Sequence, residues 1–295
     1  MEYIFHTLIL ICIFGTLGAS LNLIAGYTGM LSIAHASFFG VGAYTAALLS
    51  LSTNIPFPVV TLSSIAVSCV VGMLLIAPSL RVKGDYFVIS TFAFQVIAFQ
   101  VFNNLIGLTR GPMGLPGIPP AALGDFELST PFRFFFLSLV YLLVVHWIVA
   151  KIAGSPLGRV LTAIREDEVL TSTAGKCVAL DKFLVFIVGA GIAGGAGALY
   201  AVYIGFIDPT SFTVMDSIFI LSIVVIGGAG SVWGPFIGAT ILIAIPEALR
   251  FLGLPSSLAA DIRQLLYGGL MIGFLLWRSQ GILGNDVVEH QNAKP

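Results

Sequence analysis

The sequence carries no aspartate, glutamate, lysine or arginine between Glu2 and Arg81. This uncharged run, residues 3–80, is too long for one transmembrane helix, because a helix crosses a lipid bilayer with about 20 residues and the run has room for about three crossings. In the whole chain only 9% of the residues are charged, against about a quarter in a typical soluble domain. The chain is therefore predicted to be an integral membrane protein.

Shorter uncharged segments follow at 86–109, 134–150, 183–207, 217–246 and 264–277. Backbone polar groups in lipid must be satisfied internally, and long apolar segments without alternation achieve this as helices and not as a β-barrel. We therefore expect an all-α, polytopic bundle of about eight to ten transmembrane helices, with residues 1–295 forming a single domain. The expected helices are 4–25, 30–52, 56–79, 86–108, 131–152, 182–207, 213–230, 234–252 and 262–278.

Lysine and arginine are distributed unequally between the two sides of this bundle. With alternating helices, nine fall on the side of loop 153–181 and four on the side of loop 109–130. The positive-inside rule then places loop 153–181 and the polar tail 282–295 in the cytoplasm, and the N-terminus and loop 109–130 outside. One alternative stays open: the glycines of segment 30–52 also suit a re-entrant helix, which would invert everything before residue 53.

The long cytoplasmic loop has the signals of an amphipathic helix. Ser155 can cap its start, Pro156 can open it and Gly175 can close it. Its apolar stripe consists of Leu157, Val160, Leu161 and Ile164, and its charged residues are Arg159, Arg165, Glu166, Asp167 and Glu168. Most of these charges have no partner at helical spacing. They are predicted to be available to another protein, or else to be solvated on a helix that lies on lipid headgroups.

Several functions are disfavoured by missing motifs. Gly175-Lys176 is followed by Cys177 and does not complete a G-x-x-x-x-G-K-[ST] motif, so we expect no nucleotide hydrolysis and no enzyme activity in this chain. The cysteines and histidines share no metal-ligand spacing, which predicts no catalytic, metal-binding or cofactor-binding residues. A formal net charge of −1 provides no overall basic field for nucleic acid.

Glycine clusters recur in the uncharged segments. The cluster at 188–200 contains Gly191-x-x-x-Gly195 and is predicted to allow close helix packing. The cluster at 225–239 interrupts an apolar run with five residues, Gly227, Gly228, Gly230, Trp233 and Gly234. This interruption predicts either the lining of a cavity or gate, or a short cytoplasmic turn between two helices.

Polar residues within apolar segments are costly unless their hydrogen bonds are satisfied. We interpret His35 first as a hydrogen-bonded structural residue and second as a ligand-binding residue. Further polar residues near or within the expected helices are Tyr44, Tyr86, Gln95, Gln100, Asn103 and Asn104. They indicate either a polar pathway or hydrogen bonds between helices.

Five stretches of the chain together resemble one family. They are GYTGMLSIAHASFFGVGAYTAALL, KGDYFVISTFAFQVI, LTRGPMGLPGIP, LGRVLTAIREDEVLTSTAGKCVALDKFLVFIVGAGIAGGAGALY and IGGAGSVWGPFIGA. In this order and spacing, over roughly residues 15–280, they resemble the LivM-type permeases of bacterial branched-chain amino acid ABC importers.

The resemblance implies a passive permease subunit of an ATP-driven importer for leucine, isoleucine and valine, in the bacterial inner membrane. The implied partners are a second, LivH-like permease, two cytoplasmic ATPase subunits that bind ATP and Mg, an extracytoplasmic amino-acid-binding protein, and membrane lipid. The implied ATPase-docking residues are Leu157, Gly158, Arg159, Ala163, Ile164, Arg165, Glu166 and Gly175. Candidates for the translocation path are Gly26, Gly29, His35, Gly40, Gly42 and Tyr44, to which we add Tyr86, Gln95 and Asn103 for their polarity.

The motif LTRGPMG departs from the family, in which a second glycine often stands at the position of Arg110. Here Arg110 adds a positive charge at the outer mouth, which suits either the binding protein or a substrate carboxylate. Other branches of the family carry urea or short-chain amides and share much of the pattern, so a urea or amide permease is the alternative. An ATP-independent secondary carrier and a structural membrane scaffold are the rivals outside this class.

Overall fold

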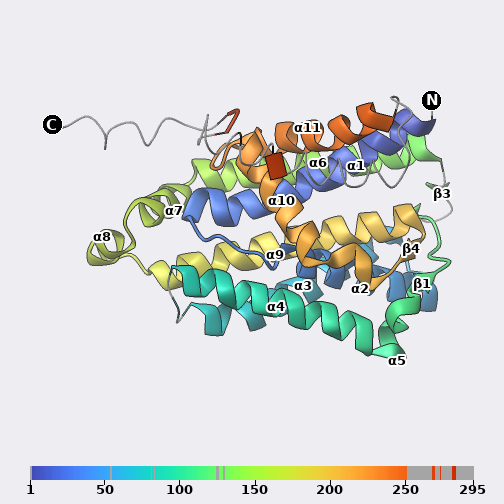
Figure 1. The fold of residues 1–295 in the computed structure, drawn as a ribbon, viewed down its shortest axis with the longest axis horizontal. Coiled ribbons are helices and arrows are strands. Elements are labelled where there is room, and N and C mark those ends of the chain that lie inside the picture. Colours follow the sequence, from blue (N-terminus) through green and yellow to red (C-terminus); the bar gives the residue numbers. More distant parts are fainter. Residues whose placement is uncertain are drawn as a thin grey trace.

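The structure, a computed structural model, describes residues 2–53, 55–80, 82, 84–123, 126–128, 130–250, 268–269, 273 and 281–283. It is a bundle of long helices that run side by side between two ends (Figure 1). The main helices are α1 (Glu2–Leu21), α2 (His35–Ser52), α3 (Phe57–Ser79), α4 (Asp85–Asn104), α6 (Pro131–Gly154), α9 (Val178–Ile204), α10 (Val214–Gly227) and α11 (Gly234–Arg250). Five helical segments in the described residues are long and apolar enough to cross a membrane, which confirms the expected all-α membrane bundle.

Some expected helices have different bounds in the structure. The helix expected over 30–52 begins only at His35, and residues 29–34 form a non-helical connection before it. The last two described helices, α10 and α11, have 14 and 17 residues and are shorter than the expected segments 213–230 and 234–252. The helix expected at 262–278 and the tail 282–295 lie outside the described residues, except for 268, 269, 273, 282 and 283.

The two long loops lie at opposite ends of the bundle. Helices α7 (Pro156–Glu166) and α8 (Glu168–Thr173) lie at one end, and strand β1 (Leu115–Pro116) lies at the other, together with the start of α1 (Figure 1). We call these the α7 end and the strand end. The arrangement agrees with the prediction that loops 153–181 and 109–130 are on opposite sides of the membrane.

Helix α2 begins inside the bundle, and residues 35–40 are all buried. The first N–H groups of a helix have no partner within the helix and must be satisfied by other groups. Here side chains of α4 and α10 accept the bonds: Ala36 N donates to Ser217 Oγ (2.9 Å) and Ser37 N to Gln95 Oε1 (2.8 Å), and just before the helix Ile33 N donates to Thr91 Oγ1 (3.2 Å). These three hydroxyl and amide groups make a buried helix start possible where water is absent.

Helix α9 occupies the centre of the bundle, and its residues 189–199 are all buried. A Cβ atom added to Gly194 would overlap Ser68 of α3, and one added to Gly197 would overlap the Phe39 carbonyl oxygen of α2. Likewise, a Cβ on Gly42 of α2 would overlap the Gly194 carbonyl oxygen. The glycines therefore bring three helix backbones into direct contact, which confirms the interpretation of the 188–200 cluster as a packing surface.

The strand end carries a small cap. Strand β1 pairs antiparallel with β4 (Phe206–Ile207), and β2 (Ala122–Leu123) pairs with β3 (Phe126–Glu127). The pairing of β1 with β4 holds this loop against the end of α9. The other cap elements are α5 (Ile106–Thr109), η2 (Gly111–Met113) and η3 (Pro209–Phe212), the last two being 3₁₀-helices.

Arg110 links α5 to η2 with a left-handed backbone, at φ 59°. It is the only non-glycine residue in the described part of the chain with a positive φ. Left-handed conformation favours glycine because a Cβ atom strains it. Arg110 is therefore kept here at a cost in stability.

The effect of a substitution at Arg110 on the free energy of unfolding is expected to depend on how well the new residue tolerates the left-handed backbone. Arg110→Gly should change the free energy of unfolding by less than about 1 kcal/mol, because relief of strain offsets the added flexibility of the unfolded chain. Arg110→Val should destabilise the protein by about 1–2 kcal/mol, since a β-branched residue tolerates the left-handed region poorly. Thermal unfolding of both variants in detergent measures the difference, and a valine variant as stable as the glycine variant would contradict the backbone assignment.

Candidate functional site

Helix α1 continues, at the α7 end, into a π-helical segment, η1 (Asn22–Gly26). The N–H group of Tyr27 reaches back to the carbonyl of Asn22, five residues earlier. Such π-helical turns insert one extra residue into a helix and occur often at functional sites. Gly29, at φ 73°, then ends the helical stretch before the chain enters α2.

The side chain of Asn22 joins this segment to the turn between α10 and α11. Its Nδ2 atom donates to the Ser231 carbonyl oxygen (2.8 Å), and its Oδ1 atom accepts from the Gly230 N–H (2.8 Å). Asn22 has no solvent-exposed surface. One amide thus satisfies two backbone groups of the turn, which fixes the turn both in position and in orientation.

The backbone of Gly26 joins the same segment to α7. Its carbonyl oxygen accepts a hydrogen bond from Arg165 Nη1 (2.7 Å). A Cβ atom on Gly26 would overlap Asn22 Oδ1 and would lie 2.5 Å from Gly230 N, so only glycine fits at this position. Three separate parts of the chain meet at this point: the end of α1, α7 and the α10–α11 turn. We call the residues that join them the α1 junction: Asn22, Gly26, Arg165, Gly230 and Ser231.

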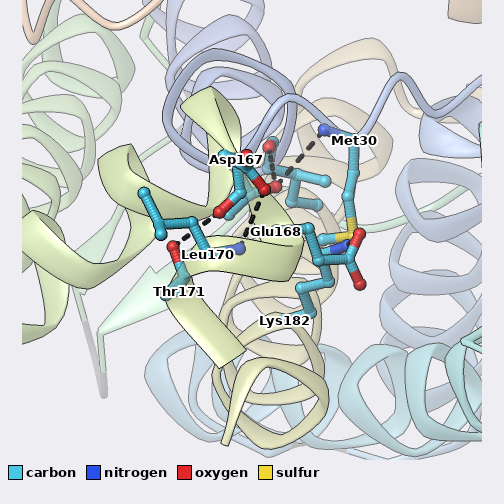
Figure 2. Close-up of polar contacts among 8 residues, drawn as sticks. Met30, Asp167, Glu168, Leu170, Thr171 and Lys182 are labelled. Atoms are coloured by element: carbon cyan, nitrogen blue, oxygen red, sulfur yellow. Dashed lines mark hydrogen bonds and ion pairs between the residues drawn. The ribbon is translucent and has the colours of Figure 1, made fainter. Parts of the chain in front are cut away.

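The α7–α8 element is formed as its sequence signals predicted, with one difference. The Gly158 N–H donates to Ser155 Oγ (3.3 Å) at the start of α7, and Gly175 follows α8 at φ 80°. The single helix expected between these points is interrupted at Asp167. The Asp167 side chain accepts from Leu170 N (2.9 Å) and starts α8 as a second short helix (Figure 2).

Three of the five charges expected to be free are engaged inside the protein. Arg165 bonds to Gly26, Asp167 caps α8, and Glu168 forms an ion pair with Lys182 Nζ (2.7 Å). Figure 2 shows the ends of Glu168 and Lys182 next to the Met30 side chain. Groups distant in sequence bind Arg165 and Glu168, and the nearby Leu170 N–H binds Asp167, so these side chains are less free than the helical spacing indicated, and a docking role for Arg165 stays a prediction.

The remaining two charges, Arg159 and Glu166, are exposed, and their side chains form no hydrogen bond or ion pair within the described part of the chain. Gly158, next to Arg159, is buried where a Cβ atom would overlap the carbonyl oxygens of Ile152 and Ala153, so it permits the sharp turn from α6 into α7. Of the other expected docking residues, Ile164 is buried, Leu157 and Ala163 are half-buried, and Gly175 is exposed. The exposed charges lie on the outer side of an otherwise anchored helix.

A cleft of about 320 Å³ lies beside α7 and α8 at this end. The loop after α1, the α3–α4 turn, α7, α8 and the start of α9 form its walls. Arg165, Glu168 and Lys182 contribute charged groups to it, and Met30 and Phe87 contribute apolar surface. The α7–α8 element therefore contacts the bundle and leaves a space beside it.

The expected path residues fall into distinct environments. His35 is buried, with Nε2 at 2.6 Å from Ser20 Oγ, as expected of a hydrogen-bonded structural residue. Gln95 bonds to Ser37 and to the Phe212 carbonyl oxygen, which makes it a link between helices.

The other path residues are not gathered into one cavity. Tyr44 is buried with a hydroxyl that has no hydrogen-bond partner among the described residues, and Tyr86 is 73% exposed. Asn103 is half-buried, Gly40 and Gly42 pack against neighbouring side chains and backbone, and Gly26 and Gly29 lie at or near the α1 junction. Their role in a translocation path stays a prediction.

The glycine-rich segment at 227–234 forms the α10–α11 turn at the α7 end. Gly227 and Gly234 lie so close together that neither has room for a Cβ atom, and Gly228 and Gly230 have positive φ angles of 111° and 86°. Trp233 is exposed, and its ring centroid lies 4.8 Å from that of His146 in α6. Of the two interpretations of this cluster, a short turn describes the geometry, and gating stays a prediction.

Asn22 is the residue of this site that the sequence alone did not single out. The signal available was an asparagine within an uncharged helical segment, four residues before a glycine. Its partners, however, lie more than 200 residues away in the chain. No local pattern indicates a contact of that separation.

Comparisons with known proteins cover nearly the whole chain. Residues 3–275 match the family described as branched-chain amino acid transport system, permease component. The chain is 34% identical to the high-affinity branched-chain amino acid transport system permease protein LivM of Salmonella typhimurium, over 90% of this chain and 67% of the relative. The LivM protein of Escherichia coli gives the same values, 34% identity over 90% and 67%.

A more distant relative comes from Methanocaldococcus jannaschii. It is a probable branched-chain amino acid transport permease protein LivM, 30% identical over 50% of this chain and 42% of the relative. No solved structure matches the chain significantly.

Proposed function

Because the chain belongs to the family of permease components of branched-chain amino acid transport systems, we propose that it carries leucine, isoleucine and valine across the bacterial inner membrane. The observation that carries the proposal is the match to this family over residues 3–275. The relatives named LivM, with 34% identity over 90% of the chain, support the same substrate class. The five apolar helical segments are consistent with a multi-pass membrane protein.

In the proposed importer the chain is a single permease domain, and separate subunits hydrolyse ATP and deliver the substrate. Two cytoplasmic ATPases bind and hydrolyse ATP with Mg, and this chain contributes neither catalytic residues nor a cofactor site. An extracytoplasmic amino-acid-binding protein delivers the substrate to the strand end. Alternating access then requires substrate and nucleotide to favour different conformations of the permease.

The ATPases are proposed to dock on α7 through the exposed face that carries Arg159 and Glu166. Two observations support this assignment: both side chains are exposed, and neither has a partner among the residues that the structure describes. Charged side chains of this kind select and orient a partner with complementary charge. The turn at Gly158 and the buried Ile164 fix the helix that presents them.

The second, LivH-like permease and membrane lipid are proposed to cover the apolar outer surfaces of α3, α4 and α6. These helices expose large side chains such as Leu74 (69%), Ile97 (59%) and Trp147 (63%). The translocation path would run where the two permeases face each other. Tyr86, on an exposed part of α4, and the half-buried Asn103 are suited to such a shared path, and Gln95 serves as a structural link beside it.

The test is uptake of labelled leucine by a bacterial strain that lacks this gene, with and without the gene restored. Restoration is expected to recover at least tenfold higher uptake, and unlabelled isoleucine and valine should compete. Urea and acetamide should not compete, and a protonophore should have no direct effect at constant ATP.

Other outcomes separate the alternatives. Restored uptake of urea or acetamide in place of leucine would overturn the substrate class while leaving the permease architecture intact. Uptake that survives loss of the ATPases but not the protonophore would indicate a secondary carrier. No change in any uptake on deletion would point to a scaffold.

A further inference from the structure

The α1 junction connects elements that are far apart in the chain. Asn22 and Gly26 belong to the π-helical end of α1, Arg165 belongs to α7, and Gly230 and Ser231 form the α10–α11 turn. The contacts are direct, because a Cβ atom placed on Gly230 would lie 3.1 Å from Arg165 Nη1. The docking helix, the end of α1 and the turn therefore touch at one point.

The π-helical segment supplies the groups that make these contacts. The helix ends within three residues of Gly26, so the Gly26 carbonyl lacks a helical N–H partner and is free to accept from Arg165. A hydrogen bond from a guanidinium group is stronger than one between neutral groups. The bond holds the C-terminal end of α7 to the end of α1.

The Asn22 amide makes the second connection rigid. It donates to one backbone group and accepts from another, one residue apart in the same turn. Two bonds from one planar group restrict rotation as well as translation. Because Asn22 is fully buried, loss of either bond would leave an unsatisfied polar group, so the turn is bound to follow the end of α1.

A cleft of about 320 Å³ lies beside α7 and α8, between them, the α3–α4 turn and the start of α9, and Arg165 itself lines it. A helix that borders such a space and is attached by specific polar bonds is able to shift, and it carries along the groups to which it is bonded. The bonded groups are the end of α1 and, through Asn22, the α10–α11 turn.

We propose that Asn22 is a positioning residue for transport, which together with Arg165 transmits movement of the docking helix α7 to the α10–α11 turn. The inference rests on the proposed function, in that α7 receives its movement from the ATPases. It goes beyond that function by naming the contacts that transmit the movement, from Arg165 in α7 to Gly26, and from Asn22 to Gly230. The glycine-rich α10–α11 turn is the part that moves in response.

The experiment uses the assembled importer with its partner subunits in nanodiscs. Amide hydrogen exchange of peptides covering 156–173 and 228–233 is measured with and without ATP, and uptake per ATP hydrolysed is measured in proteoliposomes. In the wild type, ATP is expected to change the exchange of both peptides. In Asn22→Leu and in Arg165→Met, the change at 156–173 should persist while the change at 228–233 is lost, and uptake per ATP should fall at least tenfold.

A matched control is Thr16→Val. Thr16 is fully buried in the same helix, and among the described residues its hydroxyl donates only to the Cys12 carbonyl oxygen of that helix (2.8 Å). This variant should keep both exchange responses, which separates transmission from general damage to α1.

Either of two results would overturn the proposal. One is an ATP response at 228–233 in Asn22→Leu equal to that of the wild type. If Asn22→Leu does not assemble, the exposed Arg165→Met variant decides, and a retained response at 228–233 in that variant has the same meaning. The exchange readout needs no transported substrate, so failure of leucine uptake in the wild type would reject the proposed function without deciding the transmission route.

Discussion

Replacement of Gly42 by alanine is expected to destabilise the protein by about 3 kcal/mol, at the upper end of the usual cost of overpacking. The added methyl group would overlap the carbonyl oxygen and Cα atom of Gly194, so the backbones of α2 and α9 would have to separate. Backbone atoms cannot move aside as a flexible side chain does. The melting temperature in detergent should fall by roughly 5–10 °C.

Gly107→Ala is the matched control for this substitution. Gly107 lies in α5, and a Cβ atom added there would meet no heavy atom within 4 Å. Alanine is also the better helix former, so this variant should be at least as stable as the wild type. A Gly42→Ala variant that melts within about 1 °C of the wild type would contradict the close approach of α2 and α9.

Exchange of the two free charges on α7, by Arg159→Glu combined with Glu166→Arg, is expected to lower ATP-driven uptake about 100-fold. Like charges placed across an interface cost several kcal/mol, and about 2.7 kcal/mol corresponds to that factor in affinity. Both side chains are exposed and unpaired within the described residues, so the folded permease should be unaffected. Co-purification of the ATPases with the permease measures docking, and labelled leucine measures uptake.

Lys176→Glu is the control for the docking prediction. Lys176 lies in the same loop, is exposed, and is not among the expected docking residues. It should retain co-purification and uptake. Equal loss in both variants would indicate a general effect of charge in this loop, and normal uptake with Arg159 and Glu166 reversed would reject α7 as the docking surface.

Arg165 is unsuitable for that test although the sequence suggested it. Its bond to the Gly26 carbonyl means that reversal of its charge would disturb the α1 junction as well as any docking surface. The structure thus divides the charges of this loop into a pair without a side-chain partner in the described residues, Arg159 and Glu166, and a group bonded within the protein that includes Arg165 and Glu168. The two groups call for separate experiments.

Local features of the structure were predictable from the sequence. Uncharged length set the number and position of the long helices, since hydrophobic thickness fixes how many apolar residues a crossing needs. Ser155 and Pro156 marked the start of α7, because a side-chain cap and a ring with no N–H group act within one helical turn. The packing use of the glycines in α9 was predictable for the same reason: small residues on one face permit close helix contact wherever the partner lies.

The late start of α2 and the engagement of Arg165 and Glu168 were not predictable in this way. Each depends on groups that the chain brings together only when folded: Gln95 and Ser217 at the start of α2, Lys182 beside Glu168, and Gly26 opposite Arg165. Periodicity and capping rules describe interactions within a few residues and contain no information on such partners.

The sequence alone determined that this chain is a helical membrane protein with a polar helix between two apolar halves, because these properties follow from hydrophobic length and local hydrogen bonding. Only the tertiary structure decided which polar groups face outward and which are used internally. A buried amide or carbonyl must find a partner wherever packing supplies one, and for Asn22 that partner is the backbone of the α10–α11 turn.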